Sequence, residues 1–179
     1  MHTCYTAVMS NNFDIPVPSQ YAHLAKAACL LLMHPTEKLF AVCSRRNTTI
    51  DCLPGGKMDS GETMAQTASR EAKEEIGVWV NPCALEFIFA DAIFGERDFW
   101  VESFVAQSAT AELKQMEEGI IPKWTTWAAF LENNAFKDYN NGVQRAWNDW
   151  FECKQLGKPY VFDASHLVMT SAVSNSPNV

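Results

Sequence analysis

Residues 56–78 constrain the fold of this chain more strongly than any other stretch, and they read GKMDSGETMAQTASREAKEEIGV. A helix turns by about 100° per residue, so Glu74 and Glu75 fall within about 60° of Glu71 on its surface. A helix over residues 63–76 would therefore present three carboxylates together on one face.

A second face of the same helix consists of small and aliphatic residues: Ala65, Ala68, Ala72 and Ile76. This arc is narrow, as expected of a helix that lies close against a sheet. Thr63 and Gln66 have the spacing of a capping box at the start of the helix, and Gly77 is a candidate C-cap at its end. These signals predict a helix that buries one stripe and leaves the carboxylates beside it.

The clustered carboxylates indicate a cation site. Like charges at this spacing destabilise an isolated helix, and a bound cation can offset that cost. Oxygen ligands of this kind suit Mg²⁺ or Mn²⁺, which also bind phosphate oxygens. Glu62 would lie about 180° from Glu71 if the helix were extended back to it, so it can join the cluster only from the preceding loop or first turn.

The segment resembles the Nudix box of the nucleoside-diphosphate-linked-moiety hydrolases. Eight positions match that motif: Gly56, Glu62, Arg70, Glu71, Glu74, Glu75, Gly77 and Val78. Ala72 departs from it, because a larger aliphatic residue is usual there. The resemblance covers about residues 25–152. It implies an α/β (α+β) fold, an α/β/α sandwich with a mixed β-sheet, and hydrolysis of phosphoanhydride bonds.

The resemblance also implies roles for individual residues. The family's metal ligands match Gly56 (through its carbonyl), Glu71, Glu74 and Glu75. Arg70 would orient the glutamates through a salt bridge, and Glu62 would bind metal or position water. The expected cofactor is Mg²⁺, with Mn²⁺ as a substitute.

Length and charge narrow the remaining possibilities. The chain has 179 residues, which suggests one domain, with a net charge of -7 that argues against binding nucleic acid polymers or anionic membranes. A metal-screened site can still accept a nucleotide substrate. The six cysteines lack zinc-site spacing and indicate a reducing cytoplasm. Oligomeric state stays open.

Along the chain, residues 1–20 are expected to be an irregular lead-in, 21–160 the Nudix hydrolase domain and 161–179 a flexible tail. The apolar and alternating patterns predict strands at 25–33, 39–44, 79–80, 85–93, 99–106 and 122–127, and helices at 128–134 and 142–155. Residues 53–56 are expected to form a tight turn. The six tryptophans are expected to pack against the sheet rather than to stack on bases.

Three short matches resemble mutator-type hydrolases of 8-oxo-dGTP. Arg46 ends a Ser-Arg-Arg segment whose counterpart contacts phosphate, and Lys57 is a second phosphate-binding candidate. Glu118 precedes a glycine before a tryptophan, where the family has a further metal ligand or base, and its neighbour Glu117 could be the true match. Asn140 matches an asparagine that reads a purine edge, although an Asn-Asn-Gly turn is the alternative.

The chain also departs from the mutator pattern, since it lacks two prolines before that asparagine and has a shorter loop after Arg46. The leading hypothesis is Mg²⁺-dependent cleavage of a nucleoside 5′-triphosphate to a monophosphate and pyrophosphate, with Glu74, Glu75 or Glu118 as general base. The alternatives are a Nudix hydrolase of nucleotide sugars or dinucleotides, such as ADP-ribose or NADH, and a non-catalytic nucleotide-binding module.

Overall fold

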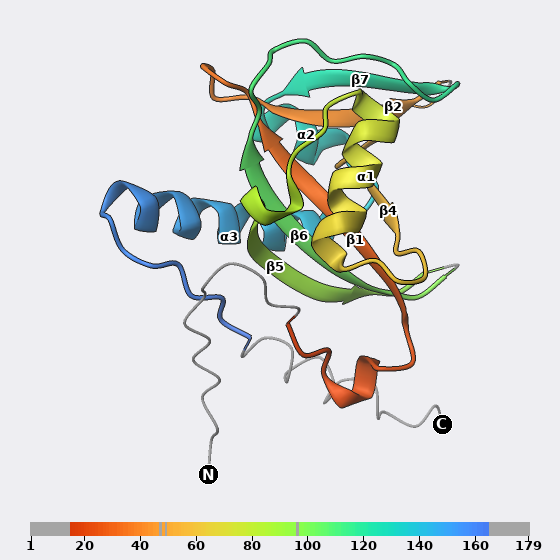
Figure 1. Cartoon of the computed structure of the whole chain (residues 1–179), viewed down its shortest axis with the longest axis vertical. Coiled ribbons are helices and arrows are strands. Elements are labelled where there is room, and N and C mark those ends of the chain that lie inside the picture. Colours follow the sequence, from red (N-terminus) through yellow and green to blue (C-terminus); the bar gives the residue numbers. More distant parts are fainter. Residues whose placement is uncertain (1–14, 47, 49, 96, 165–179) are drawn as a thin grey trace.

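The computed structural model of the chain describes residues 15–46, 48, 50–95 and 97–164 (Figure 1). Its strands are β1 (Ala25–Met33), β2 (Phe40–Arg45), β3 (Asp51–Cys52), β4 (Gly55–Lys57), β5 (Glu86–Ile93), β6 (Phe99–Gln107) and β7 (Ile120–Thr125). Its helices are α1 (Met64–Ile76), α2 (Trp127–Asn133) and α3 (Lys137–Gln155), with short 3₁₀ turns η1 (Ser19–Tyr21) and η2 (Pro82–Ala84).

The strands form one mixed sheet built around β1. Its main path runs β3-β2-β1-β6-β5, while β4 also pairs with β1 and β7 with β2. Only the β1–β6 pairing is parallel among the strand pairs described, and the rest are antiparallel. Because β1 is buried in the sheet centre, its continuous apolar sequence has partners on both faces.

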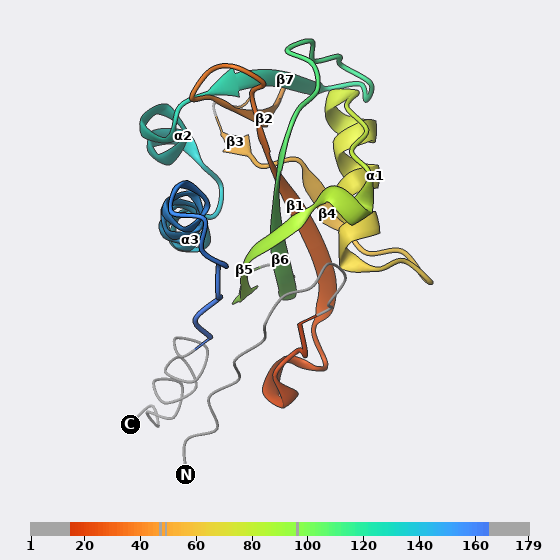
Figure 2. The ribbon, with the colours of Figure 1, turned by 60° about the vertical axis from the view of Figure 1, so that its left-hand side comes forward.

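Helices cover both faces of the sheet, which confirms the α/β/α architecture. Figure 2 shows α1 on one side of the sheet and α2 and α3 on the other. Each face has its own apolar cluster. Ala68 and Phe104 belong to the cluster under α1, whereas Phe130 and Val143 belong to the one under α2 and α3.

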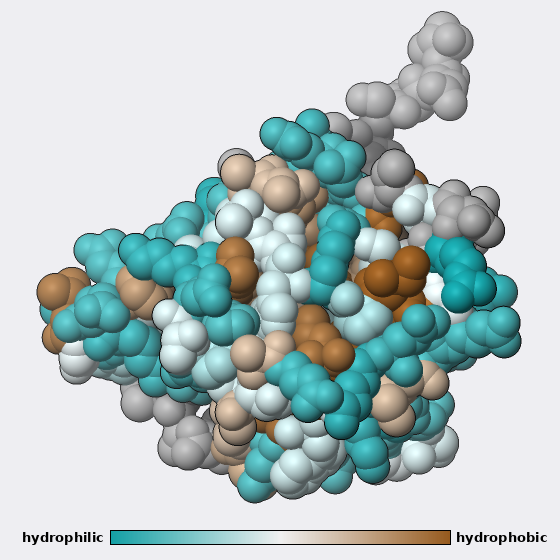
Figure 3. All heavy atoms as spheres, turned by 90° about the horizontal axis from the view of Figure 1, so that it is seen from above, coloured by the Kyte–Doolittle hydropathy of each residue, from teal (hydrophilic) through white to brown (hydrophobic). Residues whose placement is uncertain are grey.

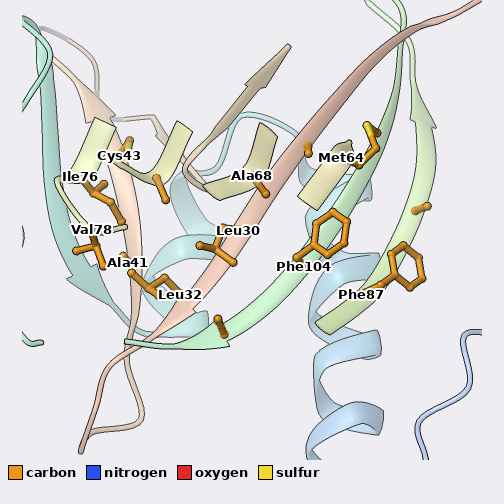
Figure 4. Packing of buried hydrophobic residues seen from close by; sticks show 14 of the residues in the cluster. Leu30, Leu32, Ala41, Cys43, Met64, Ala68, Ile76, Val78, Phe87 and Phe104 are labelled. Carbon is orange, nitrogen blue, oxygen red and sulfur yellow. The ribbon is translucent and has the colours of Figure 1, made fainter. Parts of the chain in front are cut away.

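Helix α1 lies close to the sheet because its buried stripe is made of small side chains. Ala68, Ala72 and Ile76 are fully buried and share a cluster with Leu30 of β1 (Figure 4). Thr63 caps the start of the helix through the expected capping box with Gln66. Gly77 ends it in the left-handed conformation, at φ 72°, as predicted.

Local predictions were wrong in four places. Gly55–Lys57 is a strand paired with β1 rather than a free turn. Residues 79–80 form no strand, because the Val80 carbonyl accepts a hydrogen bond from Ser69 of α1 instead of joining the sheet. The strand predicted at 122–127 runs from Ile120 to Thr125 and stops where Thr126 caps α2.

The fourth difference is the start of α3, which begins at Lys137 rather than at residue 142. Asn140 therefore lies in a helix and not in an Asn-Asn-Gly turn. The sequence was misleading because Gly142 ordinarily weakens a helix. Here its missing side chain lets the helix approach the Phe89 ring on β5, which an added Cβ would overlap.

The chain beyond α3 returns to the sheet. The Tyr160 hydroxyl donates to the Ile88 carbonyl at 2.7 Å, and the Phe162 ring packs edge-on against Phe87. Most of the predicted lead-in and tail, residues 1–14 and 165–179, lies outside the described residues. In the described part of the chain, no helix combines the length and the apolar character that a membrane span requires.

Replacing Gly142 by alanine is expected to lower the free energy of unfolding by about 1–2 kcal/mol, because overpacking against Phe89 outweighs the gain in helix propensity. Chemical denaturation measures the change. Gly95→Ala is the matched control, since a Cβ there meets no described atom within 4 Å. Equal stability of the two variants would show that α3 can shift away from β5.

Candidate functional site

Arg70 organises the carboxylates of α1. Its Nε donates to Glu62 Oε1 at 2.8 Å, and its Nη1 donates to Glu71 Oε1 at 2.7 Å and to Glu74 Oε2 at 3.0 Å. Its Nη2 reaches back to the Lys57 carbonyl at 3.0 Å. One guanidinium therefore fixes three glutamates against the end of β4, which a lysine with a single charged nitrogen could not do.

Glu62 joins this network from the loop before α1, as its position in the sequence requires. Its carboxylate also accepts hydrogen bonds from the Asp59 amide at 3.1 Å and the Thr67 hydroxyl at 2.9 Å. The hydrogen bonds from Arg70 are the main reason that the pKa of Glu62 falls to about 2. Glu62 is thus held ionised at every ordinary pH and acts as a fixed acceptor.

Glu71 lies directly against Gly56 of β4. A Cβ at Gly56 would come within 2.5 Å of Glu71 Oε1, so only glycine leaves room for this carboxylate. The Glu71 side chain is 14% exposed, and burial raises its pKa above the ordinary value. The close approach explains why a glycine belongs at position 56 although β4 needs no unusual backbone angle there.

Glu75 is the other half-buried carboxylate of the helix. Its Oε2 accepts hydrogen bonds from the Gly55 amide at 2.9 Å and from the Cys43 thiol at 3.6 Å. Burial, more than any neighbouring charge, raises the pKa of Glu75 to about 7. Neither Gly55 nor Cys43 was predicted to serve the site; the Gly-Gly pair in the sequence was the signal for the first, and no signal marks the second.

Residues 111–119 cross the C-terminal end of α1 and bring a further carboxylate to it. The Lys114 amide donates to the Ile76 carbonyl at 3.0 Å, and the Arg46 amide donates to the Gly119 carbonyl at 2.7 Å. Glu117 is among the charges that raise the pKa of Glu75. Glu117 also lines a groove together with Glu62, Arg70 and Glu74, and Glu118 is not among its lining residues. The structure thus favours Glu117, which was considered as the alternative match, over its neighbour Glu118.

The remaining predicted residues divide into two groups. Arg46 and Lys57 have exposed side chains, Arg46 just after β2 and Lys57 at the end of β4, where its carbonyl binds Arg70. Asn140 lies on α3, across the sheet from α1, and is 3% exposed. Its amide donates to Asn134 Oδ1 at 3.1 Å. A nucleobase could reach Asn140 only if the junction of α2 and α3 opened.

The donor set fits a divalent cation of the Mg²⁺ type. Glu71 and Glu75 supply carboxylate oxygens, their raised pKa values reflect charges buried without enough compensation, and Gly56 leaves space beside Glu71. Over the described residues, no three Asp, Glu, His or Cys side chains are already gathered as a metal-binding group. The carboxylates are instead directed to Arg70 and to the Gly55 amide.

Comparisons with solved structures agree with this fold. The chain is similar to the NUDIX domain of NrtR from Shewanella oneidensis, complexed with ADP ribose, with 17% identity over 76% of this chain and 93% of that one, and a TM-score of 0.59. An Ap4A hydrolase of C. elegans is 19% identical, with 72% of this chain and 98% of that one covered and a TM-score of 0.58. A MutT protein of Bacillus halodurans is 22% identical, with 69% of this chain and 82% of that one covered and a TM-score of 0.55. At these identities the likeness concerns the fold.

Sequence comparisons are more specific. The uncharacterized Nudix hydrolase YvcI of Bacillus subtilis (strain 168) is 37% identical over 71 residues, which make up 37% of this chain and 45% of that protein. The match thus spans less than half of the relative's length. The family model of the NUDIX domain matches residues 23–156, which include every strand described and all of α1, α2 and α3. The chain therefore belongs to the Nudix family.

Proposed function

We propose that this protein is a Mg²⁺-dependent pyrophosphohydrolase that cleaves a nucleoside 5′-triphosphate to a nucleoside monophosphate and pyrophosphate. The observation that carries the proposal is the pair of half-buried carboxylates, Glu71 and Glu75, held against the two glycines of β4. Such a pair is costly in the absence of a cation and well suited to binding one.

In this proposal the cation is held by Glu71, Glu75 and the Gly56 carbonyl, with Glu74 and Glu117 within reach. When bound, a divalent cation neutralises charge on phosphoryl oxygens and lowers the pKa of water. Arg70 acts by orientation, because it fixes the Glu71 and Glu74 carboxylates through a single nitrogen. The exposed Arg46 and Lys57 side chains would bind phosphate oxygens.

The reaction needs one proton acceptor. A water oxygen forms a bond to phosphorus, the bond from phosphorus to the leaving pyrophosphate oxygen breaks, and the water proton passes to a carboxylate. Glu75, with its pKa near 7, is suited to accept that proton near neutral pH. Glu74 is 54% exposed and paired with Arg70, so it is a weaker candidate for the base.

The substrate class rests on the Ser44-Arg45-Arg46 match and on the Glu118-Gly119 match before Trp124, both of which resemble triphosphate hydrolases. The experiment is a substrate panel with Mg²⁺, containing common and 8-oxo nucleoside triphosphates, ADP-ribose, NADH and a dinucleoside polyphosphate. Monophosphate plus pyrophosphate from a triphosphate supports the proposal. Cleavage of only ADP-ribose, NADH or the dinucleoside polyphosphate would change the proposed substrate class to nucleotide sugars or dinucleotides. No cleavage of any compound would favour a nucleotide-binding module.

The choice between Glu117 and Glu118 has its own test. Glu117→Gln is expected to lower kcat by about 10- to 100-fold, because Glu117 lines the same groove as Glu62, Arg70 and Glu74. Glu118→Gln removes the adjacent charge and should have a much smaller effect. Steady-state kinetics on the best substrate of the panel compares the two variants, and a larger loss in Glu118→Gln would return the role to the residue named from the sequence.

A further inference from the structure

One tryptophan behaves differently from the other five. Five have an aromatic or hydrogen-bonding partner in the structure: Trp100, Trp124, Trp127, Trp147 and Trp150. Trp79 is instead 61% exposed. It lies two residues beyond Gly77, the C-cap of α1. An exposed indole of this size near the carboxylate cluster is more informative than an exposed aliphatic residue elsewhere.

Trp79 borders a groove of about 940 Å³ that is continuous with the candidate active site. Trp79, Pro82 and Met116 supply its apolar lining. Its charged lining includes Glu62, Arg70, Glu74 and Glu117. The volume lies within the range of small-molecule sites, which combine an apolar lining with a small number of polar groups.

The apolar lining has a fixed position relative to α1. Val78, next to Trp79, is 6% exposed, and the Val80 carbonyl is bound by Ser69 of the helix. Met116 Cγ lies 3.3 Å from the position of a Cβ at Gly77, so its side chain packs on the end of the helix. The indole therefore stands on anchored backbone, a preorganised support for a planar ligand.

We propose that Trp79 and Met116 form the subsite for the nucleobase of the substrate, which stacks on the indole while the phosphates reach the carboxylate cluster. Gln66 and Lys73 also line the groove and offer polar groups to the base edge. The inference rests on the proposed function for its substrate class. It places base recognition on the α1 side of the sheet, away from Asn140.

The surface around this site is otherwise polar. Viewed from the end of the molecule where β7 and the C-terminal end of α1 lie, most of the surface is hydrophilic, with apolar residues in small separate spots (Figure 3). A planar base that seeks an apolar face therefore has few competing positions there. Stacking on an aromatic side chain tolerates any base, so the subsite supplies affinity for nucleotides and leaves base choice to the edge contacts.

The test compares Trp79→Leu with Phe94→Leu, a second exposed aromatic residue, 63% exposed, in the turn between β5 and β6. Trp79→Leu should raise KM for a nucleoside triphosphate about 10- to 100-fold with kcat within about twofold, and Trp79→Phe should restore most of the affinity. Inhibition by inorganic tripolyphosphate, which has no base, should be equal in wild type and Trp79→Leu. Phe94→Leu should match wild type throughout.

A binding readout separates this inference from the proposed function. Titration with GMP or AMP should quench tryptophan fluorescence in the wild type, and the quench should disappear in Trp79→Leu. Hydrolysis with an unchanged KM and an unchanged quench in Trp79→Leu would overturn the subsite and leave the proposed function standing. A Trp79-dependent quench without any hydrolysis would do the reverse, and the absence of both would overturn the two together.

Discussion

Turnover should fall by about 100- to 10,000-fold when Glu75 is replaced by glutamine, while the fold is retained. Glutamine keeps an oxygen that can accept from the Gly55 amide, so the link from α1 to β4 survives. It loses the negative charge and the capacity to take a proton. Steady-state kinetics with Mg²⁺ measures the loss, and near-normal turnover in this variant would remove Glu75 from the mechanism.

In the metal-free protein, Glu75 also makes the free energy of unfolding depend on pH, and the Glu75→Gln variant should lose that dependence. The pKa of Glu75 is raised from 4.5 to about 7, so the folded protein holds its proton more tightly than the unfolded chain. The Glu75 contribution therefore lowers the free energy of unfolding as pH rises from about 4.5 to about 7 and disfavours the fold fully above that window. Glu75→Gln lacks this dependence.

Urea denaturation at pH 5 and pH 8 tests this sign. Without metal, the free energy of unfolding of Glu75→Gln should increase relative to that of the wild type between pH 5 and pH 8. Adding Mg²⁺ at pH 8 should stabilise the wild type more than the variant, because a cation bound only by the folded state offsets the buried charge. An identical pH profile for the two proteins would show that the Glu75 carboxylate is better solvated than its burial implies.

The second large effect is expected from a pair of adjacent glycines that respond differently to the same change. A Cβ at Gly56 would meet the Glu71 carboxylate at 2.5 Å, whereas a Cβ at Gly55 would meet the Ala28 carbonyl at 2.5 Å. Gly56→Ala should lower kcat by about 100-fold, since displacing a reacting group by about 1 Å has that cost, with only a small loss of stability. Gly55→Ala should destabilise β4 against β1 by about 1–3 kcal/mol.

Thermal unfolding and kinetics on both variants separate the two outcomes. The Gly56 variant has a mobile carboxylate end as its obstacle, while the Gly55 variant has strand backbone, which cannot rotate away. If Gly56→Ala lost stability as heavily as Gly55→Ala and kept full turnover, the close approach of Glu71 would be a packing feature without catalytic value.

Much of the architecture followed from local pattern in the sequence. The carboxylate face, the capping box at Thr63 and the left-handed Gly77 all depend on residues within a few positions of one another, and the structure has each of them. Strand β1 could also be predicted, because the seven consecutive apolar or small residues at 27–33 are typical of a buried strand. The metal and catalytic roles stay predictions.

The features that were missed depend on contacts between distant segments. The start of α3 depends on the Phe89 ring fitting into the space left by Gly142, over fifty positions away. Likewise, Glu117 and Glu118 are adjacent and chemically identical, and only the path of residues 111–119 across α1 distinguishes them. The exposure of Trp79 could not be predicted either, because the sequence alone does not show which tryptophan will lie outside the core.

The two functions of the site are encoded in different parts of the chain. The carboxylate frame comes from one contiguous stretch, β1 to α1, residues 25–77, whereas the apolar lining of the groove comes from residues 79–82 and 116, which follow it. In the proposed site, substitutions at residues 79–82 therefore alter which molecule is accepted and leave the carboxylates of α1 in place, whereas residue 116 adjoins Glu117 of the cluster. Such an arrangement lets a lineage explore new substrates by small steps, and it makes these two segments the natural targets for laboratory evolution.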